Sequence, residues 1–385
     1  MRKFIPLIII GVILVIIFVK LWPILSDFFP TATHVIFHPG ATLKEQNGYT
    51  NVLLLGIGGG SHDGPNLTDT IILASIDWKK NTVTLISIPR DLWVPDINNV
   101  VKKANEAYAE GGMSEAEAII HEVTGQPIDY GVRLDFQGFV DAINQIGGVD
   151  VHVAHTLDDY NYPISGNEDD TCGHTPEEIQ TFNASESSSL TPDEDAFTFF
   201  SCRYTHLHVE AGLQHMDGEL ALEFARSRHA AGSEGTDFAR SARQQLIIEA
   251  VRSKLISSAF LNPGKLLGLY NIMKNSIDTD ISQGTLGLFL DKILVLKDAK
   301  INTAVIDYGD YLTGRAGLLV NAPVDAEYDY AAALIPRMGN GNFSEIQQYI
   351  SCEITKGNCV VAQSPAPQPQ AQHLQNRFLY TRRVC

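Results

Sequence analysis

Positive charge is scarce in this sequence. The 385 residues include 28 Lys+Arg against 45 Asp+Glu, which gives a formal net charge of −17 at pH 7. Nucleic-acid binding needs a broad basic surface to neutralise phosphates, so the charge balance argues against a nucleic-acid partner. A local basic pocket remains compatible with these numbers, and an acidic surround would make it selective for what reaches it.

Cysteine is also scarce, with five residues and no C-x-x-C spacing. Zinc and thiol-redox sites of the C-x-x-C type are therefore not expected. Cys172 and Cys202 flank a polar segment, and Cys352 and Cys359 lie near the C-terminus; both pairs could form disulfides in an oxidising compartment. The sequence does not settle the pairing, and Cys385 has no evident partner.

Two common catalytic patterns are missing. The glycine-rich "GIGGGS" (56–61) follows a strand-like run, but its spacing is not G-x-G-x-x-G and no G-K-[ST] follows. A flexible turn is the favoured interpretation. We also find no Ser-His-Asp arrangement.

One long hydrophobic run lies near the N-terminus, where "FIPLIIIGVILVIIFV" follows "MRK". Residues 4–25 are long enough to span a bilayer core of about 30 Å. No A-x-A cleavage site follows, which favours an uncleaved single-pass anchor over a signal peptide. Because Arg2 and Lys3 precede the run, the positive-inside rule predicts a cytoplasmic N-terminus, with the bulk of the chain outside the cell membrane.

Strand-like and helix-like segments alternate after residue 50. The runs "NVLLLGIG", "TIILASID" and "TVTLISIP" are almost continuously apolar, which is typical of strands covered on both faces. The segments 113–125 and 136–148 end at glycines and predict helices. We therefore expect an α/β fold with a central mixed β-sheet flanked by helices, a three-layer sandwich, after the N-terminal transmembrane helix.

The composition changes along the chain predict five segments. They are a cytoplasmic start and anchor (1–25), a stalk (26–47), the main domain (48–255), a smaller C-terminal region (256–360) and a Pro/Gln-rich tail (361–385). Within the main domain, the polar segment 163–200 predicts a disulfide-tied insertion.

Acidic and basic residues stand at the ends of the predicted strands. "LTDT" contains Asp69, and "SIPRD" contains Arg90 and Asp91. Open α/β sheets bind ligands at the carboxyl ends of their strands. Asp63, in "SHDG", could join Asp69 around a divalent ion, since Mg²⁺ prefers one or two carboxylates together with phosphate oxygens and water.

The stretch 221–245, "ALEFARSRHAAGSEGTDFARSARQQ", gathers arginines in an acidic chain. Arg226 and Arg228 follow one predicted helix, while Arg240 and Gln244 share a face at the start of the next, where a helix N-terminus attracts anions. Such forked, permanently charged groups suit a multiply charged phosphate. The alternative is a set of solvated arginines paired with Glu223, Glu234 and Asp237.

Two further patterns are open. In "THLHV" (205–209), strand alternation would place His206 and His208 on one face, which fits either a metal pair or the commoner polar strand face. In "ANEAYAEGG" (104–112), Asn105 and Tyr108 could line a sugar or phosphate site, although helix packing is favoured.

Taken in order, these motifs resemble the LytR-CpsA-Psr family of bacterial envelope proteins. The resemblance covers roughly residues 48–255 and includes "TDTIILASI", "ISIPRDLWV", "KKANEAYAEGG", "LDFQGFVDAINQIGGVDV", "LQHMDGELALEFARSR" and "TDFARSARQQLII". It implies a catalytic domain that transfers a glycopolymer from a polyprenyl-pyrophosphate carrier to a cell-wall acceptor, commonly a peptidoglycan hydroxyl. The expected partners are therefore the lipid-linked glycan, peptidoglycan and membrane lipid, and the expected cofactor is Mg²⁺.

Carried over by motif, the resemblance also implies residue roles. Pyrophosphate would be bound by Arg90, Arg226, Arg228, Arg240 and Gln244. Asp69 would bind Mg²⁺, and Asp91 would orient Arg90 or help with proton transfer. The chain has Gly58 and Leu67 where the family often has an acid and an arginine, and Asp63 could replace the missing metal ligand.

Two alternative functions use the same residues. The first is a hydrolase that passes lipid pyrophosphates to water. The second is a non-catalytic envelope-binding or regulatory protein that keeps the pocket.

Overall fold

The structure is a computed structural model of the whole chain. It describes residues 42–60, 64–95, 101–186, 192–256, 276–292, 295–310, 315–323 and 333–361, together with residues 269, 272 and 274. The predicted anchor, most of the stalk, Asp63 and all of the tail except its first residue lie outside these ranges. Within them, no helix is both long and apolar enough to cross a bilayer.

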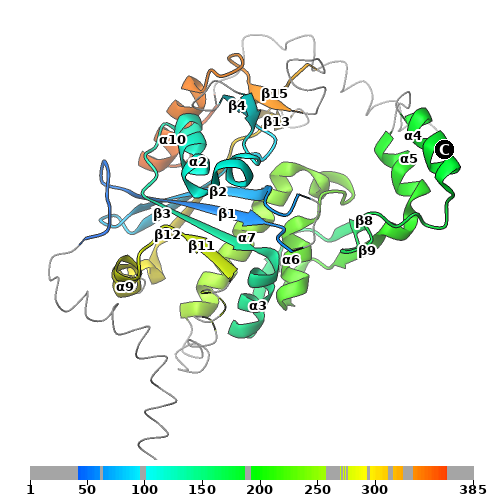
Figure 1. Cartoon of the computed structure of the whole chain (residues 1–385). Coiled ribbons are helices and arrows are strands. Elements are labelled where there is room, and N and C mark those ends of the chain that lie inside the picture. The colour runs from blue at the N-terminus through cyan, green and yellow to red at the C-terminus, as the bar shows by residue number, and fades with distance from the viewer. Residues whose placement is uncertain are drawn as a thin grey trace, which may run out of the picture.

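A six-stranded mixed sheet forms the centre of the fold (Figure 1). Its strands, in spatial order, are β11 (Ile277–Thr279), β6 (Tyr130–Asp135), β1 (Thr50–Ile57), β2 (Thr68–Asp77), β3 (Thr82–Ser87) and β12 (Lys300–Val305). β1 pairs antiparallel with β2 and parallel with β6, while β3 pairs parallel with β12. The predicted mixed sheet and the three predicted strands are confirmed.

Helices cover both faces of this sheet because its strands are apolar on both sides. On one face, α2 (Ala107–Thr124) and α10 (Ser344–Thr355) contribute Ile119, Ile120 and Ile350 to a core with Leu53 and Leu73. On the other face, α7 (Asp237–Ile256) and α9 (Gln283–Lys292) pack residues against a second cluster of buried strand residues. Figure 1 shows α2 and α10 together on the side opposite α7 and α9.

Two predicted helices end at their glycines. α2 stops at Gly125, whose φ of 64° is left-handed, but it begins earlier than the predicted residue 113 and is interrupted at Gly112. α3 (Phe136–Ile146) begins where the Asp135 carboxylate accepts a bond from the Gly138 amide, and it ends at Gly147.

A second packed unit adjoins the sheet. α3 and α6 (Gly218–Arg226) pack with β7 (Val149–Val153) and β10 (Gly212–Met216) around the buried Met216 and Phe224. Gly218 allows α6 to approach α3 closely, because a Cβ there would lie 2.2 Å from the Val140 carbonyl oxygen.

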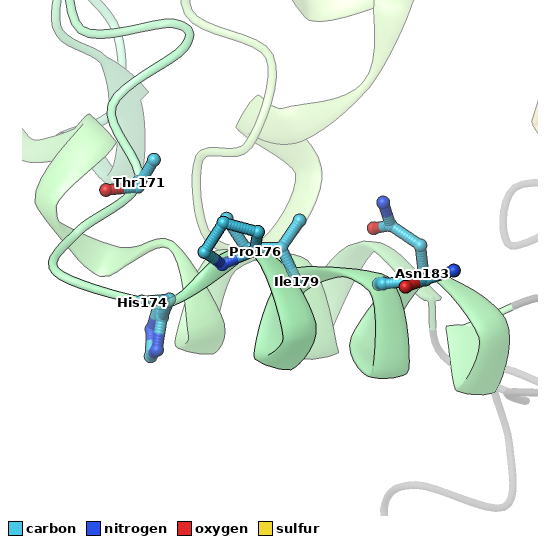
Figure 2. Close-up of a pocket in the computed structure, with 6 residues that line it drawn as sticks. Thr171, His174, Pro176, Ile179 and Asn183 are labelled. Atoms are coloured by element: carbon cyan, nitrogen blue, oxygen red, sulfur yellow. The ribbon is translucent and has the colours of Figure 1, made fainter.

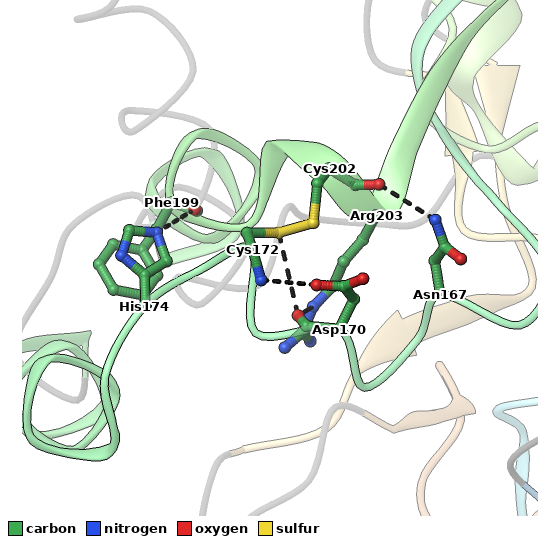
Figure 3. The surroundings of a disulfide bond; sticks show 7 residues. All are labelled: Asn167, Asp170, Cys172, His174, Phe199, Cys202 and Arg203. Atoms are coloured by element: carbon green, nitrogen blue, oxygen red, sulfur yellow. Dashed lines mark hydrogen bonds between the residues drawn. A yellow bond between two sulfur atoms is a disulfide. The ribbon is translucent and has the colours of Figure 1, made fainter.

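The polar insertion is carried on a two-stranded ribbon, β8 (Leu157–Pro163) and β9 (Tyr204–Val209), which leads from the body to α4 (Pro176–Glu186) and α5 (Pro192–Phe199) in Figure 1. The 3₁₀ turn η1 (Ser201–Arg203) connects α5 to β9. A disulfide joins Cys172 to Cys202 at the foot of the helices. Around it, Asp170 accepts bonds from the Cys172 amide at 2.7 Å and from Arg203 Nε at 2.7 Å (Figure 3).

Part of the segment beyond residue 255 joins the central sheet and its core. β11 and β12 form the two edges of the central sheet, and α10 packs on α2. The predicted smaller C-terminal region (256–360) therefore shares its core with 48–255. Its second disulfide joins Cys352 to Cys359.

Short elements complete the described chain. Three small ribbons pair β4 (Trp93–Pro95) with β5 (Val101–Lys103), β13 (Gly309–Asp310) with β14 (Arg315–Ala316), and β15 (Leu319–Asn321) with β16 (Leu334–Pro336). The 3₁₀ turns η2 (Gly232–Gly235) and η4 (Val295–Asp298) precede α7 and β12.

Candidate functional site

One edge of the central sheet collects most of the predicted site residues. β1, β3, β6 and β12 run in the same direction and end at this edge, and β2 begins there. Asp69 lies at the start of β2, and Arg90 and Asp91 follow the end of β3. The arrangement matches the position at which open α/β sheets bind ligands.

Asp69 and Arg90 form an ion pair across this edge. The Arg90 side chain is 26% exposed and that of Asp69 is 31% exposed, so both can still reach a ligand. Burial alone would lower the pKa of Arg90, but Asp69 and Asp91 outweigh it and the pKa lies above its ordinary value. Arg90 therefore stays a cation.

Asp91 lies between two cations. One of its carboxylate oxygens is 3.5 Å from Arg90 Nε, and the other accepts a bond from Lys103 Nζ at 3.2 Å. Lys103 was not among the predicted site residues, although it stands beside Asn105 in a motif that the sequence singled out. Because Lys103 follows Asp91 by 12 residues, no local spacing in the sequence predicted this pair.

Asn105 and Tyr108 have structural roles. The Asn105 backbone donates to the Arg90 carbonyl at 3.1 Å and accepts from the Thr68 amide at 3.1 Å, which holds the two strand ends together. The Tyr108 hydroxyl donates to Asp278 at 2.7 Å. The Tyr108 side chain also packs against the buried core that α2 helps to form, which fits the helix-packing interpretation of this motif.

A small pocket opens beside Asp69. Arg240 and Gln244, from α7, line it together with Thr70, and Gln244 Nε2 donates to Thr70 Oγ1 at 3.1 Å. The rest of its lining comes from Ile71 on β2, Ser241 on α7, Leu334, and the ends of β3 and β12 with the residues that follow them. The structure thus places Asp69, Arg240 and Gln244 around one pocket, and their roles stay predictions.

Arg226 is held by two aromatic residues. Its guanidinium lies 4.3 Å from the centre of the Phe136 ring, directly after β6, and it interacts with the Tyr162 hydroxyl on β8. Burial raises the pKa of Tyr162 to about 12, against a smaller lowering by Arg226. Arg226 is therefore at the β6 end of the same sheet edge, although it does not line the pocket at Asp69.

The backbone around Arg228 is fixed by a buried acid. Asp159, which is fully buried, accepts bonds from Ser227 Oγ at 2.7 Å, from the Arg228 amide at 3.3 Å and from the His229 amide at 3.2 Å. The sequence gave no sign of this role, because Asp159 lies in the polar strand β8 some seventy residues earlier.

Arg243, which was not predicted, is a structural residue. It is 2% exposed and donates to the carbonyls of Phe224 and Ser227 at 2.9 and 2.6 Å and to Glu234 at 3.1 Å. Glu234, which the alternative interpretation paired with the predicted arginines, accepts a bond from Arg243.

The sheet edge offers Mg²⁺ one predicted carboxylate ligand. Asp69 is the one predicted metal ligand among the described residues. These residues include two clusters of three side chains that could bind a metal, and Asp69 belongs to neither. A single carboxylate suits Mg²⁺ when substrate phosphate oxygens complete the coordination. Asp63, the second predicted ligand, lies outside the described residues.

A second hollow lies on the insertion, far along the chain from these residues. Figure 2 shows its lining, which consists of Thr171, His174, Pro176, Ile179, Gln180 and Asn183. It contains no acid, arginine or lysine and shares no residue with the pocket at Asp69. It is therefore not the candidate active site.

Comparison with known proteins decides the family. The model of the LytR_cpsA_psr family matches residues 31–327, which is most of the chain and extends well beyond residue 255. The chain belongs to the LytR-CpsA-Psr family.

A curated relative agrees with this assignment. The polyisoprenyl-teichoic acid–peptidoglycan teichoic acid transferase TagV of Bacillus subtilis (strain 168) is 29% identical over 251 residues, which cover 64% of this chain and 53% of the relative. The chain thus spans about half the length of that curated relative.

Solved structures share the fold. The crystal structure of B. subtilis TagV matches with a TM-score of 0.52 and 22% identity, covering 80% of this chain and 98% of that one. Protein gbs0355 from Streptococcus agalactiae matches with a TM-score of 0.55 and 21% identity, covering 89% and 97%.

Proposed function

We propose that this protein transfers a glycopolymer from a polyprenyl-pyrophosphate carrier to a peptidoglycan hydroxyl. The observation that carries the proposal is the cluster of Asp69, Arg90, Arg240 and Gln244 at the carboxyl edge of the sheet, in a chain of this family. The name of the relative TagV describes the same class of reaction.

Four of the charged groups at the edge compensate one another. Asp69 and Asp91 balance Arg90 and Lys103, so this group of four is formally neutral. Arg226, Arg228 and Arg240 are the further cations that we propose contact the pyrophosphate. Arginine suits this role because its planar fork can donate two parallel bonds to phosphate oxygens.

The reaction needs charge neutralisation and alignment more than a covalent nucleophile. The acceptor hydroxyl oxygen forms a bond to the phosphorus that carries the glycan, and the bridging P–O bond breaks. Polyprenyl phosphate leaves, the hydroxyl proton passes to solvent, and the product is a phosphodiester. Arg90 stabilises charge on the phosphate oxygens, and Asp91, held by Lys103, orients Arg90.

We assign Mg²⁺ as the cofactor, with Asp69 as its protein ligand. When bound, the ion neutralises charge on the pyrophosphate oxygens. The Arg90 ion pair holds the Asp69 carboxylate at the edge of the sheet before substrate arrives.

A membrane anchor at residues 1–25 would place the domain beside its lipid-linked donor, with the bulk of the chain extracytoplasmic. Mass spectrometry of the N-terminus of the mature protein tests this. An intact N-terminus supports the anchor, and a protein that begins near residue 34 contradicts it.

The decisive experiment for the function is product analysis. The full-length protein in detergent is supplied with a polyprenyl-pyrophosphate-linked glycan and Mg²⁺, with and without peptidoglycan fragments. We expect polyprenyl phosphate and a glycan–peptidoglycan phosphodiester that form only when the acceptor is present. Release at the same rate without acceptor would identify a hydrolase, and no turnover under either condition would identify a binding protein.

A further inference from the structure

Three side chains with metal-binding atoms converge on the ribbon that carries the insertion. His206 and His208 alternate on β9 and so point to the same face, and Asp158 on β8 stands directly opposite His208. His206 Nε2 lies 3.0 Å from Asp158 Oδ1, and His208 Nδ1 lies 2.7 Å from the same oxygen. All three are at least partly open to solvent.

The spacing of these atoms fits a small tetrahedral ion. The two nitrogens and the oxygen all lie within 4.8 Å of one another. Ligand atoms about 2.0–2.2 Å from a tetrahedral zinc lie roughly 3.3–3.6 Å apart, so small rotations of the three side chains would suffice. Two imidazoles and a carboxylate suit zinc, whereas Mg²⁺ prefers oxygen ligands alone.

We propose that Asp158, His206 and His208 form a zinc site, with water in the fourth position. This site is separate from the proposed transfer chemistry at the sheet edge. None of its three residues contributes to the pocket beside Asp69.

Contacts with neighbouring side chains fix the orientation of both histidine rings. His208 Nε2, the nitrogen that faces away from Asp158, lies 3.2 Å from Glu210 Oε1. A carboxylate that accepts the second N–H of a histidine fixes its tautomer and frees the other nitrogen for the metal. The His206 ring stacks on Tyr160, with ring centroids 4.0 Å apart and nearly parallel planes.

The position of the site gives it a structural consequence. Bound zinc would join β8 to β9 at the end of the ribbon nearest the body, where Figure 1 shows the ribbon leaving it. Asp158 also accepts a backbone bond from Ala231 at 2.8 Å, and the adjacent Asp159 holds the Ser227–His229 segment. The ion would therefore stabilise the base of the insertion beside the arginine segment.

Zinc titration of the untagged, full-length protein by isothermal calorimetry tests the site. We expect one equivalent of Zn²⁺ to bind, and Mg²⁺ to produce no signal at this site. His206→Ala and His208→Ala should each weaken zinc binding at least tenfold, and Glu210→Gln should weaken it by about tenfold as the loss of an orienting carboxylate. Bound Co²⁺ should show the visible absorption of a tetrahedral site.

The matched control is His152→Ala, which removes an exposed histidine on β7 outside the cluster. It should bind zinc as the wild type does. The metal-free variants should all melt at the wild-type temperature, because the changed residues lie on the surface. Equal zinc binding by the wild type and the His206→Ala/His208→Ala double variant, or an equal loss in His152→Ala, would overturn the proposal.

Discussion

The guanidinium of Arg90, which follows β3, pairs with the carboxylate of Asp69 at the start of β2, at the edge where the sheet collects its charged residues. Each group neutralises the other in the protein without substrate. A pyrophosphate and its cation would exchange these partners, since the phosphate takes Arg90 and the cation takes Asp69. The pair therefore keeps both groups in position without leaving a partly buried charge uncompensated.

Replacing Asp69 by asparagine tests the metal assignment. Asp69→Asn removes the charge proposed to bind Mg²⁺ and leaves Arg90 with Asp91 alone. We expect turnover to fall by about a hundredfold or more, equivalent to roughly 2.7 kcal/mol of barrier, and the remaining rate to depend weakly on Mg²⁺. Rates measured over a Mg²⁺ titration provide the test.

Asp141→Asn is the control for this change, because Asp141 is exposed on α3 and contacts Gln137. It should keep the wild-type rate and Mg²⁺ dependence. If Asp69→Asn retains the wild-type Mg²⁺ dependence, Asp69 is not the metal ligand.

Replacing Arg226 by lysine separates charge from geometry. Arg226→Lys keeps the charge but loses the fork that donates two parallel bonds to phosphate. Turnover should fall on the order of tenfold to a thousandfold, about 1.4–4 kcal/mol of barrier. Loss of the Phe136 and Tyr162 contacts should cost no more than about 1 kcal/mol of stability.

The matched control is Lys79→Arg, in the turn between β2 and β3 at the opposite edge of the sheet. Steady-state kinetics and denaturant unfolding of both variants provide the measurements. A wild-type turnover rate in Arg226→Lys, or an equal loss of turnover in Lys79→Arg, would show that Arg226 does not bind the substrate.

We expect the folded protein to lose stability at alkaline pH because Tyr162 is buried. Because burial raises its pKa from 10.0 to about 12, the folded protein holds this proton more tightly than the unfolded chain does. The resulting stability is fully present below about pH 10 and is lost as the pH rises toward about 12, by roughly 2–3 kcal/mol.

Denaturant unfolding at several pH values between 9 and 12 checks this, with Tyr162→Phe as the variant. The stability difference between wild type and Tyr162→Phe should shrink as the pH rises, whereas Tyr160→Phe, at an exposed tyrosine, should follow the wild type. A difference that stays constant over this range would rule out the raised pKa.

The Cys172–Cys202 disulfide should stabilise the insertion and leave catalysis unchanged. It closes a loop of 30 residues on the ribbon β8–β9, away from the sheet edge, and is worth up to about 3 kcal/mol in the chain-entropy model. Cys172→Ser/Cys202→Ser should make α4 and α5 sensitive to limited proteolysis while turnover stays at the wild-type rate. Non-reducing peptide mapping of the wild type should recover the cross-linked peptide. A loss of turnover as large as that of Arg226→Lys would contradict this separation.

Local patterns in the sequence predicted the strands and helices whose own residues favour that structure. The apolar runs of β1, β2 and β3 and the terminal glycines of α2 and α3 reflect the backbone preferences of those residues, and the structure confirms them. The arginine motif likewise placed Arg240 and Gln244 on one face of α7, where both line the pocket.

Contacts between distant segments could not be predicted in the same way. β12 joins the sheet beside β3 over two hundred residues later in the chain, and its short run does not reveal its partner. The contacts of Tyr162 with Arg226, and of Asp159 with the Ser227–His229 segment, depend on how the β8–β9 ribbon packs against α6. Only the folded structure brings these residues together.

A crystal structure of the protein with Mg²⁺ and a non-hydrolysable polyprenyl-pyrophosphate analogue tests the central claim most directly. The account predicts the pyrophosphate at the carboxyl edge of the central sheet, with its oxygens bonded to Arg90, Arg226 and Arg240 and the ion bound to Asp69. A pyrophosphate bound elsewhere, such as in the hollow on α4, or bound at the edge without contact to these arginines, would contradict it.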